Sequence, residues 1–180
     1  MGTATPYIYT IPDAQATFEE FGDRQDIGTF YPGLIFGDQW TTGDWRTGTY
    51  SGKYPRGRYT SDGNIFASTA YLGYDSGRIY VSTKKLRLLV SNNGDVTLTA
   101  YNSSGQVVDS IVTGGNDYTG WMTMLEVSGD ISYVIISGTV NRFLIDDVRF
   151  EIAECTIKRD EGIYSKERYC FQGEGIFVNR

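Results

Sequence analysis

The chain of 180 residues contains no histidine. Serine–histidine–aspartate triads and cysteine–histidine pairs both use the imidazole ring as a general base. Many zinc sites also depend on imidazole nitrogen as a ligand. The absence of histidine therefore removes imidazole acid–base chemistry and histidine-ligated zinc from the functions open to this chain.

Cysteine is scarce, and its two copies lie close together as Cys155 and Cys170. A disulfide closing this short loop would stabilise the fold by about 3 kcal/mol in the chain-entropy model. Such a bond forms in oxidising compartments, so it favours an extracellular protein. Two free, buried thiols are the alternative.

Long apolar runs are missing as well, since no stretch approaches the roughly 20 residues needed to span a bilayer. The first residues, 1–6, lack the charged and apolar regions of a signal peptide, so the protein is either cytoplasmic or lacks its leader here. The net charge of −6 would repel a phosphate backbone, which argues against nucleic acid as a partner.

Helical periodicity is nearly absent, while 22 glycines and 14 tyrosines accompany only 4 prolines. This composition is typical of all-β proteins with many turns. The stretch Asp13–Phe21 could form a turn of helix or a short strand. Strand patterns recur at Leu34–Phe36, Asn64–Tyr71, Arg78–Ser82, Lys85–Val90, Val96–Tyr101, Gln106–Thr113, Trp121–Val127, Ile131–Ser137 and Phe143–Ile152.

About eight to ten antiparallel strands at such short spacing predict a β-sandwich rather than a parallel α/β sheet. We expect an N-terminal extension or strand over residues 1–16 and the sandwich over residues 17–151. Residues 152–180 are rich in charge and read as a hairpin appendage closed by Cys155 and Cys170, followed by a last apolar strand.

An aromatic-rich segment, Gly37–Gly63, interrupts the strand pattern. Aromatic rings among short polar residues suit a sugar-binding surface, because a ring stacks on the apolar face of a pyranose while polar groups bind its hydroxyls. The alternative is that the rings pack over one end of the sandwich. The candidate ligand-binding residues are Trp40, Asp44, Trp45, Arg46, Tyr50 and Tyr54.

Paired carboxylates stand near both ends of the expected sandwich. Asp146 and Asp147 lie inside the apolar run Phe143–Phe150, where alternation along a strand turns at least one of them inward or to a sheet margin. Hard oxygen ligands of this kind suit calcium. The alternative is that they end the strand or pair with Arg142 or Arg149. The candidate calcium ligands are Glu19, Glu20, Asp146 and Asp147.

Three blocks in order resemble a known family: Phe18–Glu20 with Phe30–Phe36, then Val96–Val108, then Phe143–Phe150. Together they are similar to the galactose-binding-like jelly-roll domains of secreted and surface proteins, which include carbohydrate-binding modules. The resemblance covers about Thr17 to Glu151. It implies a jelly-roll fold and a structural calcium joining the first strand to the last, through Glu19 or Glu20 and Asp147, with Asp146 less directly implicated.

The hypothesis that unites these observations is a non-catalytic, extracellular carbohydrate-binding or adhesion domain with a structural calcium and a glycan partner. The alternative is a structural subunit of a surface layer, filament or virion. Its terminal strands would pair with neighbouring copies of the chain. Catalysis would need two carboxylates across a cleft, and no spacing among the acidic residues places two of them so.

Overall fold

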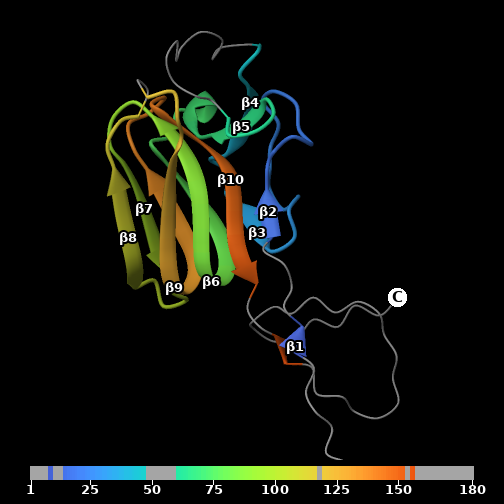
Figure 1. Ribbon diagram of the computed structural model, residues 1–180, viewed down its shortest axis with the longest axis vertical. Helices are drawn as coiled ribbons and strands as arrows, with labels where there is room; N and C mark the ends of the chain where they lie inside the picture. The colour runs from blue at the N-terminus through green and yellow to red at the C-terminus, as the bar shows by residue number, and fades with distance from the viewer. Residues whose placement is uncertain (1–7, 10–13, 48–59, 117–118, 153–154, 157–180) are drawn as a thin grey trace, which may run out of the picture.

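The computed structural model describes residues 8–9, 14–47, 60–116, 119–152 and 155–156. Within them the regular secondary structure is almost entirely β-strand, which confirms the all-β expectation (Figure 1). One turn of 3-10 helix, η2, covers Ala70–Leu72. The strands are β1 (Ile8–Tyr9), β2 (Ala14–Ala16), β3 (Leu34–Phe36), β4 (Thr41–Asp44), β5 (Ile65–Ser68), β6 (Ser76–Asn92), β7 (Val96–Tyr101), β8 (Val107–Thr113), β9 (Thr123–Ser137), β10 (Phe143–Ile152) and β11 (Cys155–Thr156).

Nine strands join in one antiparallel sheet in the order β4-β5-β10-β6-β9-β7-β8, with β2 also on β10 and β3 also on β6. The two longest strands change partners along their length. Residues 79–81 of β6 pair with β3, whereas residues 83–92 pair with β10. Residues 123–131 of β9 pair with β6, and residues 133–137 pair with both β6 and β7.

These changes of partner divide the sheet into two layers. One layer contains β2 and β5 beside β10, then β6 and β9; the other runs from β3 through β6, β9 and β7 to β8. The two layers give the strand order of a jelly-roll sandwich in which β6 and β9 belong to both.

A β-bulge around Thr83 marks the place where β6 passes between the layers. The register with β9 shifts on both sides of Thr83, and a bulge of this kind bends a strand. The buried positions change parity there, from Val81 before the bulge to Leu86 after it. The sequence predicts two strands, Arg78–Ser82 and Lys85–Val90, and the gap between them coincides with the bulge.

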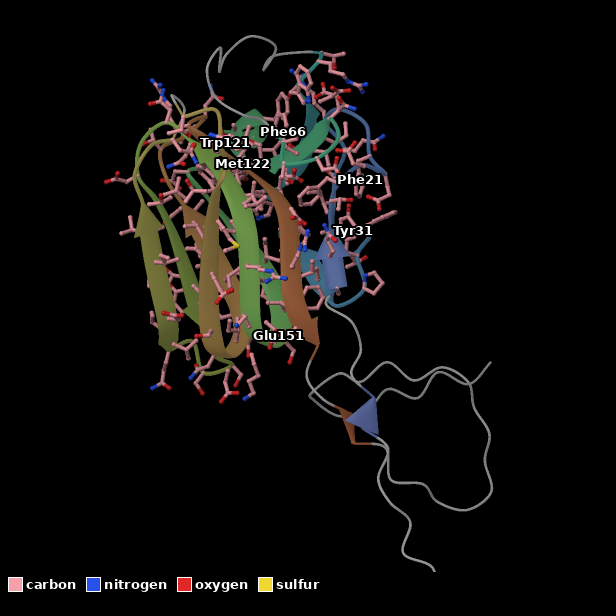
Figure 2. The ribbon with its side chains drawn as sticks, in the orientation of Figure 1. Phe21, Tyr31, Phe66, Trp121, Met122 and Glu151 are labelled. Carbon is pink, nitrogen blue, oxygen red and sulfur yellow. The ribbon has the colours of Figure 1, made fainter. Side chains whose placement is uncertain are left out.

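The core lies between the two layers and is formed by the inward side chains of alternating positions. Its members on β6, β7, β9 and β10 include Ile79, Val81, Leu86, Leu88, Val90, Leu98, Leu125, Val127, Val134, Ile136, Val148 and Phe150. A second, smaller cluster joins Phe66 of β5 and Leu144 of β10 to Met122 and to residues of η2. Figure 2 shows Phe66 and Met122 close together at one end of the sandwich, with Glu151 at the other end.

Residues 8–9 and 155–156 of the two expected terminal extensions pair with each other, whereas residues 14–16 and 152 belong to the main sheet. Strands β1 and β11 form an antiparallel pair in which Ile8 lies opposite Thr156 and Tyr9 opposite Cys155. Cys170, the side chain of Cys155 and the rest of the expected hairpin lie outside the described residues, so the disulfide stays a prediction. Within the part of the chain that the structure describes, no helix has the length and apolar character needed to cross a membrane.

Candidate functional site

Trp40 was expected at a ligand-binding surface, but the structure places it in the core, with 1% of its surface exposed. Its ring packs edge-on against Phe36 and Phe143, at centroid distances of 6.1 and 6.4 Å. Its indole Nε1–H donates to the carbonyl oxygen of Arg78 at 3.1 Å. Trp40 is therefore a core residue that packs against the β6 backbone, and it lies neither at a ligand-binding surface nor over one end of the sandwich.

The neighbouring candidates Asp44 and Arg46 bind each other. The Asp44 carboxylate accepts hydrogen bonds from the Arg46 amide at 2.9 Å, from Nε at 3.0 Å and from Nη2 at 2.6 Å. The hydrogen bond from the Arg46 side chain lowers the pKa of Asp44. Trp45 between them is 38% exposed, and Tyr50 and Tyr54 lie outside the described residues. The mutual pairing satisfies both charges, and Trp45 is the described member of this group with a partly exposed ring.

The candidate calcium ligands near the N-terminus accept hydrogen bonds from the protein. Oε1 of Glu19 accepts from the backbone amides of Asn64 at 2.8 Å and Ile65 at 2.7 Å. Oε2 of Glu20 accepts from the Tyr31 hydroxyl at 2.7 Å. Burial and this contact with Glu20 raise the pKa of Tyr31.

Asp146 and Asp147 take different roles, as their adjacency on a strand predicts. Asp146 is 1% exposed, and its Oδ2 accepts from the Ser61 amide at 2.7 Å and the Ser61 hydroxyl at 2.9 Å. Burial raises the pKa of Asp146 to about 6, although the hydrogen bonds from Ser61 oppose that rise. The Asp147 carboxylate accepts from Arg149 Nε at 3.0 Å and Nη2 at 2.9 Å, and from the side-chain amide Nε2 of Gln15. Pairing with Arg149 was the alternative expected for one of these aspartates.

Among the residues that the structure describes, no group of three or more histidine, cysteine, aspartate and glutamate side chains converges to hold a metal ion. Each of the four expected calcium ligands already accepts a hydrogen bond from a protein donor. The calcium site stays a prediction.

A row of tyrosines crosses the outer face of the layer formed by β3, β6, β9 and β7. Strand pairing places Ile35 opposite Tyr80, Tyr80 opposite Tyr133, and Tyr133 opposite Tyr101. Since neighbouring strands lie about 4.8 Å apart, the three tyrosines extend over about 10 Å, and over about 14 Å together with Ile35. Tyr101 and Tyr133 stack at a centroid distance of 4.8 Å with their planes 7° apart, and Tyr80 is tilted by 49° against Tyr133 at 6.1 Å.

Arg78 lies beside this row on β6. Its guanidinium carbon is 4.8 Å from the ring centre of Tyr133 and 5.6 Å from that of Tyr80. Nη1 also donates to the Tyr80 hydroxyl at 3.3 Å, and this bond raises the pKa of Arg78. Cation–π contacts of this kind restrict the movement of the guanidinium group.

A pocket of about 520 Å³ opens next to Tyr80. Two tyrosine rings on its wall remain accessible, with Tyr74 47% and Tyr80 41% exposed. Asp38 and Gln39 add polar groups, and the aliphatic side chains of Ile35 and Ile135 add apolar surface. The described lining comprises Ile35, Phe36, Gly37, Asp38, Gln39, Tyr74, Ser76, Gly77, Arg78, Tyr80 and Ile135.

Trp40 packs beneath one wall of this pocket. A Cβ atom on Gly77 would lie 2.3 Å from the Trp40 ring, so only glycine lets β6 approach the ring this closely. The expected ligand-binding tryptophan thus supports the strand that carries Arg78 and Tyr80. Sequence reasoning missed both pocket tyrosines, although alternation in Arg78–Ser82 puts Arg78 and Tyr80 on the face opposite the apolar Ile79 and Val81.

The sequence matches no protein-family model and no curated protein. Among solved structures, the fold is similar to BiXyn10A CBM1 in its apo form, with 14% identity, a TM-score of 0.29, and coverage of 42% of this chain and 72% of that one. It is also similar to the salicylyl-acyltransferase SsfX3 from a tetracycline biosynthetic pathway. That similarity has 15% identity, a TM-score of 0.42, and coverage of 83% of this chain and 42% of the acyltransferase. At these TM-scores neither similarity carries an argument about function.

Proposed function

We propose that this protein is a carbohydrate-binding domain and that its ligand occupies the pocket beside Tyr80. The observation that carries the proposal is the composition of that pocket. Two half-exposed tyrosine rings flank it, and Asp38, Gln39 and Arg78 supply polar groups of three kinds. Sugar recognition uses this combination, because a ring packs against the apolar C–H face of a pyranose while polar side chains bind its hydroxyls.

The tyrosine row extends this surface beyond the pocket. Tyr133 and Tyr101 continue the line from Tyr80 across two further strands, over a length that exceeds one sugar ring. Because these two rings stack face to face, they present edges and hydroxyl groups to solvent more than open faces. The row therefore suits hydrogen bonding to successive units of a glycan chain, with stacking reserved for Tyr74 and Tyr80.

Binding fits this site better than hydrolysis does. Most glycosidases place two carboxyl groups on opposite sides of the scissile bond. Within its described lining, the pocket has Asp38 as its acidic residue. A binding module for glycans, extracellular as the sequence predicts and adhesive where the glycan is on a surface, is accordingly the function we propose.

The test compares the tyrosine pocket with the site expected from the sequence. Affinity electrophoresis and calorimetry against a panel of polysaccharides should reveal at least one ligand. Tyr74→Ala and Tyr80→Ala should each weaken binding by about tenfold or more, because each removes a stacking surface. Trp45→Ala is the matched control, since its ring is similarly exposed but belongs to the Asp44–Arg46 group.

Unchanged binding in Trp45→Ala with loss in both tyrosine variants would support the pocket. Loss in Trp45→Ala alone would move the site to the aromatic segment predicted from the sequence. Uniform mobility of the unaltered protein across a broad panel would contradict carbohydrate binding itself.

A further inference from the structure

Arg78 has a positive charge that no described carboxylate balances. Other basic side chains form ion pairs, such as Arg46 with Asp44 and Arg149 with Asp147. The described contacts of Arg78 are instead with the neutral rings of Tyr80 and Tyr133 and with the Tyr80 hydroxyl. The guanidinium group is thus held in place by aromatic contacts, while its charge remains available to a ligand.

Asp38 lines the same pocket, but its carboxylate does not balance the charge of Arg78. No ion pair joins Asp38 to Arg78 within 4.0 Å in the described structure. The described pocket wall therefore presents one cation, the Arg78 guanidinium, which is not paired with the Asp38 carboxylate. The Gln39 amide and the tyrosine hydroxyls are its neutral polar groups. This set matches a ligand that has one carboxylate together with several hydroxyl groups.

We propose that the pocket selects an acidic sugar, a uronic acid unit whose carboxylate pairs with the Arg78 guanidinium; this inference rests on the proposed carbohydrate-binding function. A guanidinium group can donate two parallel hydrogen bonds to a carboxylate, and such charge-assisted pairs are stronger than neutral ones. Asp38 and Gln39 then accept and donate hydrogen bonds to the ring hydroxyls. A neutral sugar would leave the Arg78 charge without a partner.

The preordering of Arg78 adds to the selectivity. A free arginine side chain loses rotamer entropy when it is immobilised on a ligand, and that loss reduces affinity. Tyr80 and Tyr133 already restrict this side chain before a ligand arrives. The net charge of −6 repels a polyanion at long range. Discrimination between acidic and neutral sugars therefore comes from the short-range ion pair at Arg78. It persists at about 0.15 M salt, where the long-range repulsion is screened.

The experiment uses matched ligands and matched variants of the full chain. Polygalacturonate, alginate and hyaluronan are tested beside their carboxyl-reduced forms, which keep each linkage and ring but replace the carboxylate by a hydroxymethyl group. Arg78→Met removes the charge and keeps much of the aliphatic stem, and Arg78→Lys keeps the charge without the planar fork. Thermal melting of each variant checks that it folds.

We expect at least one acidic glycan to bind about tenfold more tightly than its reduced form, and Arg78→Met to abolish this preference. Arg78→Lys should keep part of it. Equal binding of the acidic and reduced forms would overturn the uronic acid assignment and leave carbohydrate binding standing. A preference that persists in a folded Arg78→Met variant would overturn the role of Arg78. Binding to no glycan of either kind would overturn both the assignment and the proposed function.

Discussion

Single carboxyl groups in this protein are used mainly as hydrogen-bond acceptors for the backbone. Glu19 accepts from the amides of Asn64 and Ile65, and Asp146 accepts from the amide and hydroxyl of Ser61. Glu19 and Asp146 are far apart in the sequence, and both bind the backbone of the short segment 61–65. Asp146 does so from a buried position, where its charged form is poorly solvated, and this is why its pKa is raised to about 6.

The raised pKa of Asp146 predicts an unusual pH dependence of stability. The folded state binds this proton more tightly than the unfolded chain, whose carboxyl has the model value of 3.8. The resulting stabilisation is fully present below about pH 4 and is lost as the pH rises through about 6, with a total of about 3 kcal/mol. The difference in unfolding free energy between the unaltered protein and Asp146→Asn isolates this contribution, because the cost of the amide does not change with pH.

Urea unfolding at a series of pH values from 4 to 7.5 measures that difference. We expect the free energy of unfolding of Asp146→Asn to rise by about 2.4 kcal/mol relative to that of the unaltered protein between pH 4 and 7.5. A difference that stays constant with pH would show that Asp146 has an ordinary pKa.

At the scale of elements, one asparagine side chain connects the loop after β8 to the buried end of β6. Asn116 Oδ1 accepts from the Asn92 amide at 2.9 Å. Its Nδ2 donates to the Val90 carbonyl at 2.8 Å and to the Thr123 hydroxyl at 2.8 Å. Asn92 in turn donates to the Gly114 carbonyl at 2.9 Å. Buried hydrogen bonds therefore fix the loop to β6 and to the start of β9.

Removal of this side chain should be costly. Asn116→Ala would leave the Asn92 amide and the Val90 carbonyl buried without these partners, and each unsatisfied group costs about 1–3 kcal/mol. We expect the free energy of unfolding in urea to fall by about 2–4 kcal/mol. Asn93→Ala is the control, because its side chain takes part in none of these bonds. Equal losses in the two variants would mean that the Asn116 bonds contribute little.

On the scale of the whole molecule, the start and the end of the sandwich meet where β2 pairs with β10. Glu19, Glu20, Asp146 and Asp147, the calcium ligands predicted from the sequence, lie on or near these two strands, and the calcium site itself stays a prediction. Each of them already accepts a hydrogen bond from the protein, and calcium binding would use the lone pairs that these bonds leave available.

Calcium binding at these carboxylates would appear as a change of thermal stability. If the ion binds the folded state, calcium at one hundred times its dissociation constant should stabilise the protein by about 3 kcal/mol and raise the melting temperature by several degrees. Calorimetry with calcium, with chelator and with magnesium measures this shift. Asp147→Asn should reduce it. An identical melting temperature under all three conditions would leave the carboxylates as hydrogen-bond acceptors and ion-pair partners alone.

Local sequence patterns determined much of this protein. Alternation of apolar and polar residues predicts most of the strands, because each strand of a sandwich must bury one face and expose the other. The alternation of apolar and polar residues along β6 is also interrupted at the bulge around Thr83. Strand alternation also predicts that adjacent Asp146 and Asp147 cannot share an environment, and the structure places one in the interior and pairs the other with Arg149.

Only the tertiary structure decided which aromatic rings face solvent. Trp40 and Trp45 have similar local surroundings in the sequence, yet Trp40 is covered by Phe143 from the distant strand β10 as well as by the nearby Phe36. Likewise, Tyr80, Tyr133 and Tyr101 become one row through the pairing of three strands. Burial and alignment of this kind depend on long-range contacts, and the local pattern of residues does not encode which strands will become neighbours.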